Sequence, residues 1–242
     1  MFRHKGKSRD LNHNIGIASF LSFVAGIVNV VGFLSVQKLT TNVTGHFAFM
    51  VEEAFKFNLN QALFYFIYIF FFLAGAFFSN FIIEVIEKFT DKYIFILPVL
   101  TEVLILSIIA TLKIDYITKN PNLVACSLLF AMGLQNSLVT TISNSVVRTT
   151  HLTGLFTDLG IEFSQLFFFK SKEQKLKLVA SIKLRMTIIA SFFTGGIIAG
   201  VFYSNFKMKT LLIASLILLI GLIIDFLNVR YKIKKFKERY GN

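Results

Sequence analysis

Residues 15–36 read Ile-Gly-Ile-Ala-Ser-Phe-Leu-Ser-Phe-Val-Ala-Gly-Ile-Val-Asn-Val-Val-Gly-Phe-Leu-Ser-Val and contain no charged side chain. A membrane-spanning helix needs about 20 mostly apolar residues. Five further stretches meet this requirement, at 60–83, 93–112, 122–142, 186–204 and 210–228. Because a helix satisfies its own backbone hydrogen bonds in lipid, the sequence predicts an all-α integral membrane protein of six transmembrane helices.

The composition favours a single membrane domain over residues 1–242. Apolar residues make up 55% of the 242 residues, and charged residues make up 16%. A soluble domain carries about 25% charged residues, so the charge is too low to coat a water-facing surface. The long polar start and the length of the first apolar stretch are unlike a cleaved signal peptide. The single cysteine excludes an internal disulfide.

The positive charges indicate an orientation. With six spans, 19 of the 25 Lys and Arg residues fall on the side of both chain ends. Positive charge accumulates on the cytoplasmic side, so both termini are expected there. The basic tails, residues 1–14 and 229–242, flank apolar spans, and we therefore expect them to meet anionic lipid headgroups rather than nucleic acid.

Two parts of the chain, residues 15–112 and 122–228, carry the same ordered motifs. Gly-Ile-Val-Asn at 26–29 is followed by Thr-Thr-Asn-Val-Thr-Gly-His-Phe at 40–47. Gly-Leu-Gln-Asn at 133–136 is followed by Thr-Thr-His-Leu-Thr-Gly-Leu-Phe at 149–156. This order predicts two internal repeats. Small residues in the next span of each repeat predict close helix packing, with Ala74, Gly75 and Ser79 matched to Gly195, Gly196 and Gly200.

These motifs resemble the YoaK family of uncharacterised bacterial membrane proteins, over nearly the whole chain from about residue 15. The second motif, Arg-Thr-Thr-His-Leu-Thr-Gly-Leu-Phe-Thr-Asp-Leu-Gly from residue 148, is the more specific match. The resemblance implies a multi-pass protein of the bacterial inner membrane and supplies no substrate. The first motif departs from the family pattern, which has Asp in place of Asn29 and Met-Thr-Gly-Asn in place of residues 43–46. The departure puts in doubt whether this member keeps the family's activity.

Two short segments, 43–57 and 151–169, begin at Thr-Gly and are interrupted by acids. A carboxylate at the centre of a span costs about 2.5–3.5 kcal/mol on insertion scales. We therefore interpret both segments as half-helices or re-entrant segments, which is typical of transporters with internal repeats. The threonines at their starts are expected either to cap the helices or to offer hydroxyls to a ligand.

Polar residues inside the predicted spans are further candidates for a binding site. Glu102 is an intramembrane carboxylate, for which function is the default hypothesis. Asn29 and Asn136 occupy matching places in the repeats and face either a cavity or a neighbouring helix, while Arg148 either pairs with Asp158 or Glu162 or anchors the interface. The full candidate set for a substrate or ion site is Asn29, Thr40, Thr41, Thr44, Gly45, Glu53, Glu102, Gln135, Asn136, Thr149, Thr150, Thr153, Gly154, Asp158 and Glu162.

These features favour a secondary transporter of a small solute or ion. No catalytic, nucleotide-binding or metal-ligating motif occurs, so no enzyme activity, cofactor or metal is expected. The carboxylates suggest coupling to protons or cations, and the paired helix starts suggest a solute with an anionic group. The alternatives are a non-transporting scaffold or assembly factor, and an intramembrane hydrolase that uses His151, Asp158 and Glu162.

An eight-span topology competes with six spans. If both short segments cross the membrane, each repeat has four spans and the repeats are parallel. The positive charges then divide in the same way, so they do not discriminate. Six spans are preferred because of the acids and the shortness of 43–57, and they require inverted repeats.

Overall fold

The computed structural model describes residues 11–89, 94–168 and 171–240, and this part of the chain is helical without strands. The predicted all-α class is therefore confirmed. The helices are α1 Leu11–Val36, α2 Thr44–Phe55, α3 Leu59–Glu87, α4 Ile96–Thr111, α5 Ile114–Lys119, α6 Pro121–Ser143, α7 Leu152–Gln165, α8 Lys172–Phe206, the 3₁₀ helix η2 Lys207–Thr210, and α9 Leu211–Tyr240.

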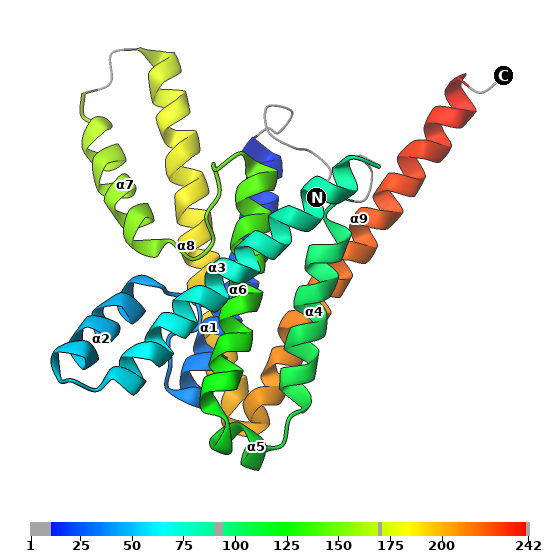
Figure 1. Cartoon of the computed structure of the whole chain (residues 1–242). Coiled ribbons are helices and arrows are strands. Elements are labelled where there is room, and N and C mark those ends of the chain that lie inside the picture. The colour runs from blue at the N-terminus through cyan, green and yellow to red at the C-terminus, as the bar shows by residue number, and fades with distance from the viewer. Residues whose placement is uncertain (1–10, 90–93, 169–170, 241–242) are drawn as a thin grey trace.

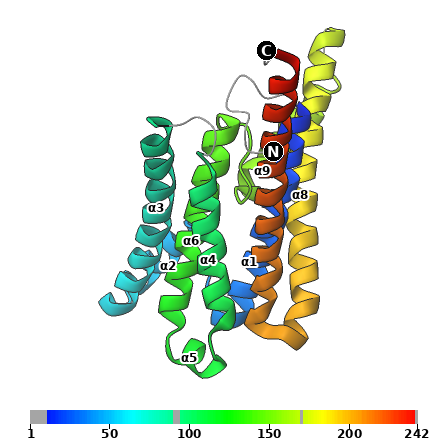
Figure 2. The ribbon, with the colours of Figure 1, turned by 90° about the vertical axis from the view of Figure 1, so that its right-hand side faces the viewer.

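The long helices run side by side, and the two short ones lie at different levels. Figure 2 shows α1, α3, α4, α6, α8 and α9 with their axes roughly aligned, whereas Figure 1 shows that α3 crosses α6 obliquely and that α9 is tilted away from α8. Helix α2 lies toward the end of the bundle at which α1 finishes, whereas α7 lies toward the end at which α1 begins (Figure 1). Neither short helix runs along the bundle between long helices.

Four helical stretches in the described residues are long and apolar enough to cross a membrane: Leu11–Val36, Leu59–Glu87, Pro121–Ser143 and Lys172–Leu227. The last stretch includes α8, η2 and part of α9, and the chain reverses direction within it (Figure 2). Helix α4 is apolar but has 16 residues. The structure thus supports a membrane protein with several apolar helices.

Helices α1 and α8 touch at two glycines. A Cβ atom on Gly26 would lie 2.0 Å from the backbone oxygen of Phe192, and one on Gly195 would lie 2.1 Å from that of Phe23. Real Cβ atoms essentially never approach within 3.0 Å of such an atom. The two backbones are therefore as close as glycine alone permits.

Helices α3 and α6 repeat this contact. A Cβ atom on Gly75 would lie 2.0 Å from the oxygen of Phe130, and one on Gly133 would lie 2.1 Å from that of Phe72. The predicted close packing is confirmed at these glycines. By these contacts Gly75 corresponds to Gly195, so the sequence-based matching with Gly196 was shifted by one residue.

The two C-terminal helices extend beyond the predicted spans. Helix α8 begins at Lys172 rather than near 186, because Ser171 accepts a hydrogen bond of 3.1 Å from the backbone of Gln174 and caps a polar first section. Helix α9 continues to Tyr240. Hydropathy detects the part of a helix that suits lipid and misses polar extensions. Helix α5 was not predicted. Of the expected basic tails, residues 1–10 and 241–242 lie outside the described residues.

Candidate functional site

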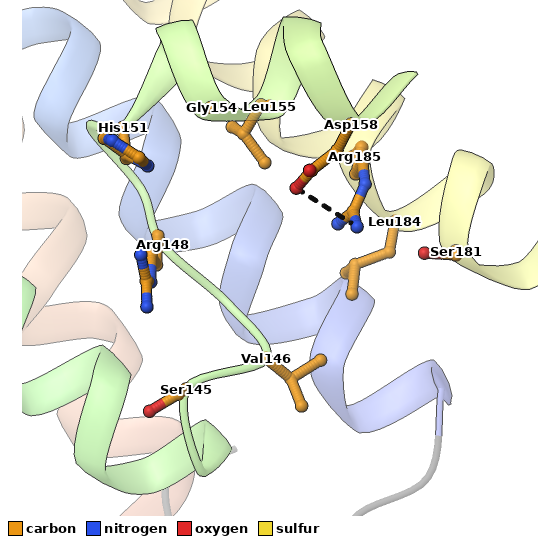
Figure 3. Close-up of a pocket in the computed structure, with 10 residues that line it drawn as sticks. All are labelled: Ser145, Val146, Arg148, His151, Gly154, Leu155, Asp158, Ser181, Leu184 and Arg185. Atoms are coloured by element: carbon orange, nitrogen blue, oxygen red, sulfur yellow. Dashed lines mark ion pairs between the residues drawn. The ribbon is translucent and has the colours of Figure 1, made fainter. Parts of the chain in front are cut away.

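A pocket of about 520 Å³ lies between α7, α8 and the segment that joins α6 to α7 (Figure 3). Helix α6 ends at Ser143. Its C-cap residue Asn144 has the left-handed backbone conformation that asparagine tolerates, and Ser145 also has a positive φ. This turn directs the chain along one side of the pocket toward α7 (Figure 3). The lining residues are Ser145, Val146, Arg148, His151, Gly154, Leu155, Asp158, Ser181, Leu184 and Arg185.

An ion-pair cluster joins α7 to α8 at this pocket. Arg185 Nη2 lies 3.2 Å from Asp158 Oδ2, and Arg185 Nε lies 3.1 Å from Glu162 Oε2. The second contact is within ion-pair distance but lacks hydrogen-bond geometry, so both of its atoms are buried without a hydrogen bond in the described residues. The side chains of Arg185, Asp158 and Glu162 are 21%, 48% and 11% exposed, so the carboxylates differ strongly in their access to water.

The partner of both acids is Arg185, so the alternative in which Arg148 pairs with them is not observed, and its role as an interface anchor stays a prediction. Arg148 is exposed on the wall of the pocket. Arg185 escaped sequence reasoning because it lies on the helix after the motif. Its place directly before the predicted span 186–204 was the available signal, although Lys183 and other lysines precede it. His151 lies against Gly154, where a Cβ atom would come within 2.5 Å of the imidazole ring.

The matched asparagines bind the matched threonines. Thr41 Oγ1 donates to Asn29 Oδ1 at 2.7 Å. Thr150 Oγ1 donates to Asn136 Oδ1 at 3.0 Å, and Thr149 Oγ1 lies 3.3 Å from the same oxygen. The amide oxygens that were candidates for a shared cavity therefore tie the end of each Thr-Thr segment to the helix before it.

Thr40 and Gln135 have buried backbone partners. Thr40 Oγ1 donates to the oxygen of Val28 at 3.3 Å, and Gln135 Nε2 donates to the oxygen of Leu21 at 2.8 Å. Both side chains are fully buried. These bonds satisfy the Thr40 hydroxyl and the Gln135 amide nitrogen, whereas Gln135 Oε1 is buried without a hydrogen-bond partner in the described residues.

The threonines do not cap the short helices. Helix α2 begins at Thr44 and α7 at Leu152, and neither has a side-chain cap on its N-cap residue. Instead, Asn42 Oδ1 accepts a hydrogen bond of 3.0 Å from the backbone of Gly45. Thr44 and Thr153 are exposed. The predicted capping role is therefore wrong, whereas a role in ligand binding stays a prediction.

Glu53 and Glu162 occupy matching sequence positions in different surroundings. Glu53 accepts hydrogen bonds from Lys56 at 3.4 Å and from Asn58 Nδ2 at 2.8 Å. Hydrogen bonds to Glu52 and Glu53 raise the pKa of the exposed Lys56 ammonium. Glu162 is buried beside Arg185. Only the second acid belongs to a clustered site.

Glu102 lies apart from the pocket lining, on α4. Its side chain is fully buried, and neither carboxyl oxygen has a hydrogen-bond partner in the described residues. Helix α4 packs against α9 and α6. A buried acid without a partner is costly, so its retention keeps the hypothesis of a functional role open.

An aromatic cluster occupies the contact between α2 and α3. The ring of buried His46 lies 5.9 Å from that of Tyr65 and 5.0 Å from that of Tyr68. The rings of Phe49 and Tyr65 are 5.4 Å apart, and the ammonium of Lys38 lies 5.3 Å from the Tyr65 ring. None of these five residues belongs to the candidate set, so the α2–α3 contact is aromatic where the α7–α8 contact contains the candidate acids.

Comparison with curated proteins and with solved structures found no match. The family described as Protein of unknown function (DUF1275) matches residues 17–224, which confirms an uncharacterised family over almost the whole chain; the name YoaK stays a prediction. The chain belongs to this family, DUF1275.

Proposed function

We propose that the chain is a secondary transporter of a small solute or ion, with six spans arranged as two inverted repeats. The expected location is the bacterial inner membrane, with both termini in the cytoplasm and the basic tails against anionic lipid headgroups. The α7–α8 pocket is the proposed solute site.

The directions of the long helices support six spans. Along the chain, α1, α3, α4, α6, α8 and α9 alternate in direction (Figure 2), and α2 and α7 sit at different levels of the bundle (Figure 1). Helix α4 is about 24 Å long at 1.5 Å per residue, shorter than a hydrocarbon core of about 30 Å, so its apolar composition rather than its length supports counting it as a span. With three spans in each repeat, the second repeat is inverted relative to the first.

The contacts between the two repeats support a two-fold axis that relates one repeat to the other. Helix α1 packs on α8, and α6, its counterpart, packs on α3, which is the counterpart of α8. Each contact uses one glycine per helix at matching positions. Transporters with inverted repeats often place their site between the two halves. Here the residues that line the α7–α8 pocket all belong to the second repeat.

The observation that carries the proposal is the Arg185–Asp158–Glu162 cluster beside a pocket of about 520 Å³. Burying charges in a predominantly apolar helical protein costs stability, so charges near a cavity point to a solute or ion. The cluster also disfavours an intramembrane hydrolase, because both acids contact Arg185 whereas His151 lies against Gly154.

Reconstitution of the purified protein into liposomes tests transport. We expect electrogenic or pH-linked solute flux that Glu162→Gln reduces strongly. The matched control is Glu173→Gln, which removes an exposed acid paired with Lys177 on the same helix as Arg185. Absence of flux, together with co-purification of a membrane partner, would instead support a scaffold.

A further inference from the structure

We propose that Arg185 binds the anionic group of the transported solute, and that this group is an oxyanion which takes the place of Asp158 on the guanidinium. The inference rests on the proposed function, because it assigns the chemical class of solute to the same pocket. It starts from a comparison of two contacts within the chain.

The same helix contact occurs twice, once between aromatic rings and once between charged side chains. Phe49 lies four residues after Gly45, as Asp158 lies four residues after Gly154. Tyr65 lies ten residues before Gly75, as Arg185 lies ten residues before Gly195. At these matching positions the first half places two rings 5.4 Å apart, and the second half places an ion pair at 3.2 Å.

The fold therefore needs contact at this position but does not need charge. An aromatic pair holds α2 against α3 without burying an ion, whereas the charged version pays for desolvation of Arg185 and Glu162. A charged contact that packing does not require is better explained by a ligand. The pocket beside it supplies the space, since about 520 Å³ lies within the usual range for small-molecule sites.

The geometry of the cluster allows the guanidinium of Arg185 to bind another oxyanion. A guanidinium carries five N–H donors in a planar fork that fits two oxygens of one carboxylate or phosphate. Here the contact between Arg185 Nε and Glu162 lacks hydrogen-bond geometry, so the Nε–H donor has no acceptor in the described residues. Figure 3 shows Asp158 and Arg185 meeting at the edge of the pocket.

The two acids take different parts in this exchange. Asp158 is 48% exposed, so water solvates its carboxylate when it leaves Arg185. Glu162 is 11% exposed and stays beside the guanidinium as a positioning residue. Arg148 lies across the pocket on its wall and adds a second positive charge (Figure 3).

Equilibrium binding to the purified full chain tests the inference without requiring flux. The probes are sodium acetate, succinate, phosphate and sulfate, with sodium chloride at equal ionic strength as reference, and the readout is the unfolding midpoint in detergent. We expect at least one oxyanion to raise the midpoint saturably above chloride, because a ligand that binds the folded state stabilises it.

Four variants identify the residue responsible. Asp158→Asn removes the competitor and is expected to tighten oxyanion binding roughly two- to fivefold, the range for a half-exposed ion pair. Arg185→Gln should abolish the shift, and Arg185→Lys should weaken it because a point charge replaces the fork. Lys183→Gln, an exposed cation on the same helix, is the matched control and should bind as the wild type does.

The inference is overturned if none of the four oxyanions exceeds chloride in either the wild type or Asp158→Asn, or if Arg185→Gln keeps the shift. If Arg185→Gln does not fold, the other two variants still test the inference. Oxyanion binding should become tighter in Asp158→Asn and weaker in Arg185→Lys. Oxyanion binding without flux in liposomes would support the site and contradict transport. Flux of a cation or a neutral solute without oxyanion binding would support transport and contradict the oxyanion site.

Discussion

Replacing Gly26 with alanine should separate α1 from α8 and lower stability. The new Cβ atom would lie 2.0 Å from a backbone oxygen, where at least 3.0 Å is needed, so the helices must part by about 1 Å. Overpacking of this kind costs about 1–3 kcal/mol, with the upper end expected because a backbone atom cannot rotate away. The higher helix propensity of alanine relative to glycine offsets about 0.8–1 kcal/mol of this cost. The net loss is then about 2 kcal/mol, or roughly 4–8 °C in melting temperature for a chain of this size.

Gly16→Ala, on the same helix, is the matched control. Apart from the neighbouring backbone of the helix itself, no atom lies within 4 Å of the Cβ position at Gly16. This substitution should be neutral or slightly stabilising through the same gain in propensity. The single cysteine, Cys126, is buried, so a thiol-reactive fluorogenic dye reports unfolding of the purified protein. Equal melting temperatures for Gly26→Ala and Gly16→Ala would refute the close approach of α1 and α8.

Three further predictions address topology, the polar contacts and the acids. Unique cysteines at Asn58 and Asn120, with the native cysteine replaced, should both label from outside the cell with an impermeant maleimide; labelling from the inside alone would establish eight spans. Thr150→Val should lower the free energy of unfolding by about 0.5–1.5 kcal/mol, since it removes the hydrogen bond to the preceding helix, and an unchanged denaturation midpoint would contradict that role. Glu162→Gln and Glu53→Gln should both impair flux with normal expression, the first more strongly because it lies in the cluster; normal flux and unchanged pH dependence in both would remove the coupling role.

Most of the helices could be predicted because lipid imposes a simple rule on composition and length. The apolar stretches 15–36, 60–83 and 122–142 fall within α1, α3 and α6 with small differences at the ends. The polar first section of α8 and the continuation of α9 could not be found in this way, because outside lipid a helix no longer requires apolar side chains. Their extent depends on caps and on contacts with water.

The candidate site was predicted in part. The motif around residue 149 pointed to Gly154 and Asp158, which line the pocket, and to Glu162, which contacts Arg185 beside it. The asparagine and threonine motifs, in contrast, are bonded to each other across each repeat. A motif marks residues whose types are constrained, but spacing alone does not distinguish a side chain that binds a ligand from one that binds its neighbour.

The sequence by itself determined the helical class, the membrane character and the repeated motifs, because hydropathy and local order depend on residues close together in the chain. Only the tertiary structure decided which helices meet, that Gly75 corresponds to Gly195, and that Arg185 rather than Arg148 holds the two acids. It also decided that the matching contact in the first half is aromatic. These are contacts between helices far apart in sequence, and their partners depend on how the backbones pack, which glycine at the crossing points permits.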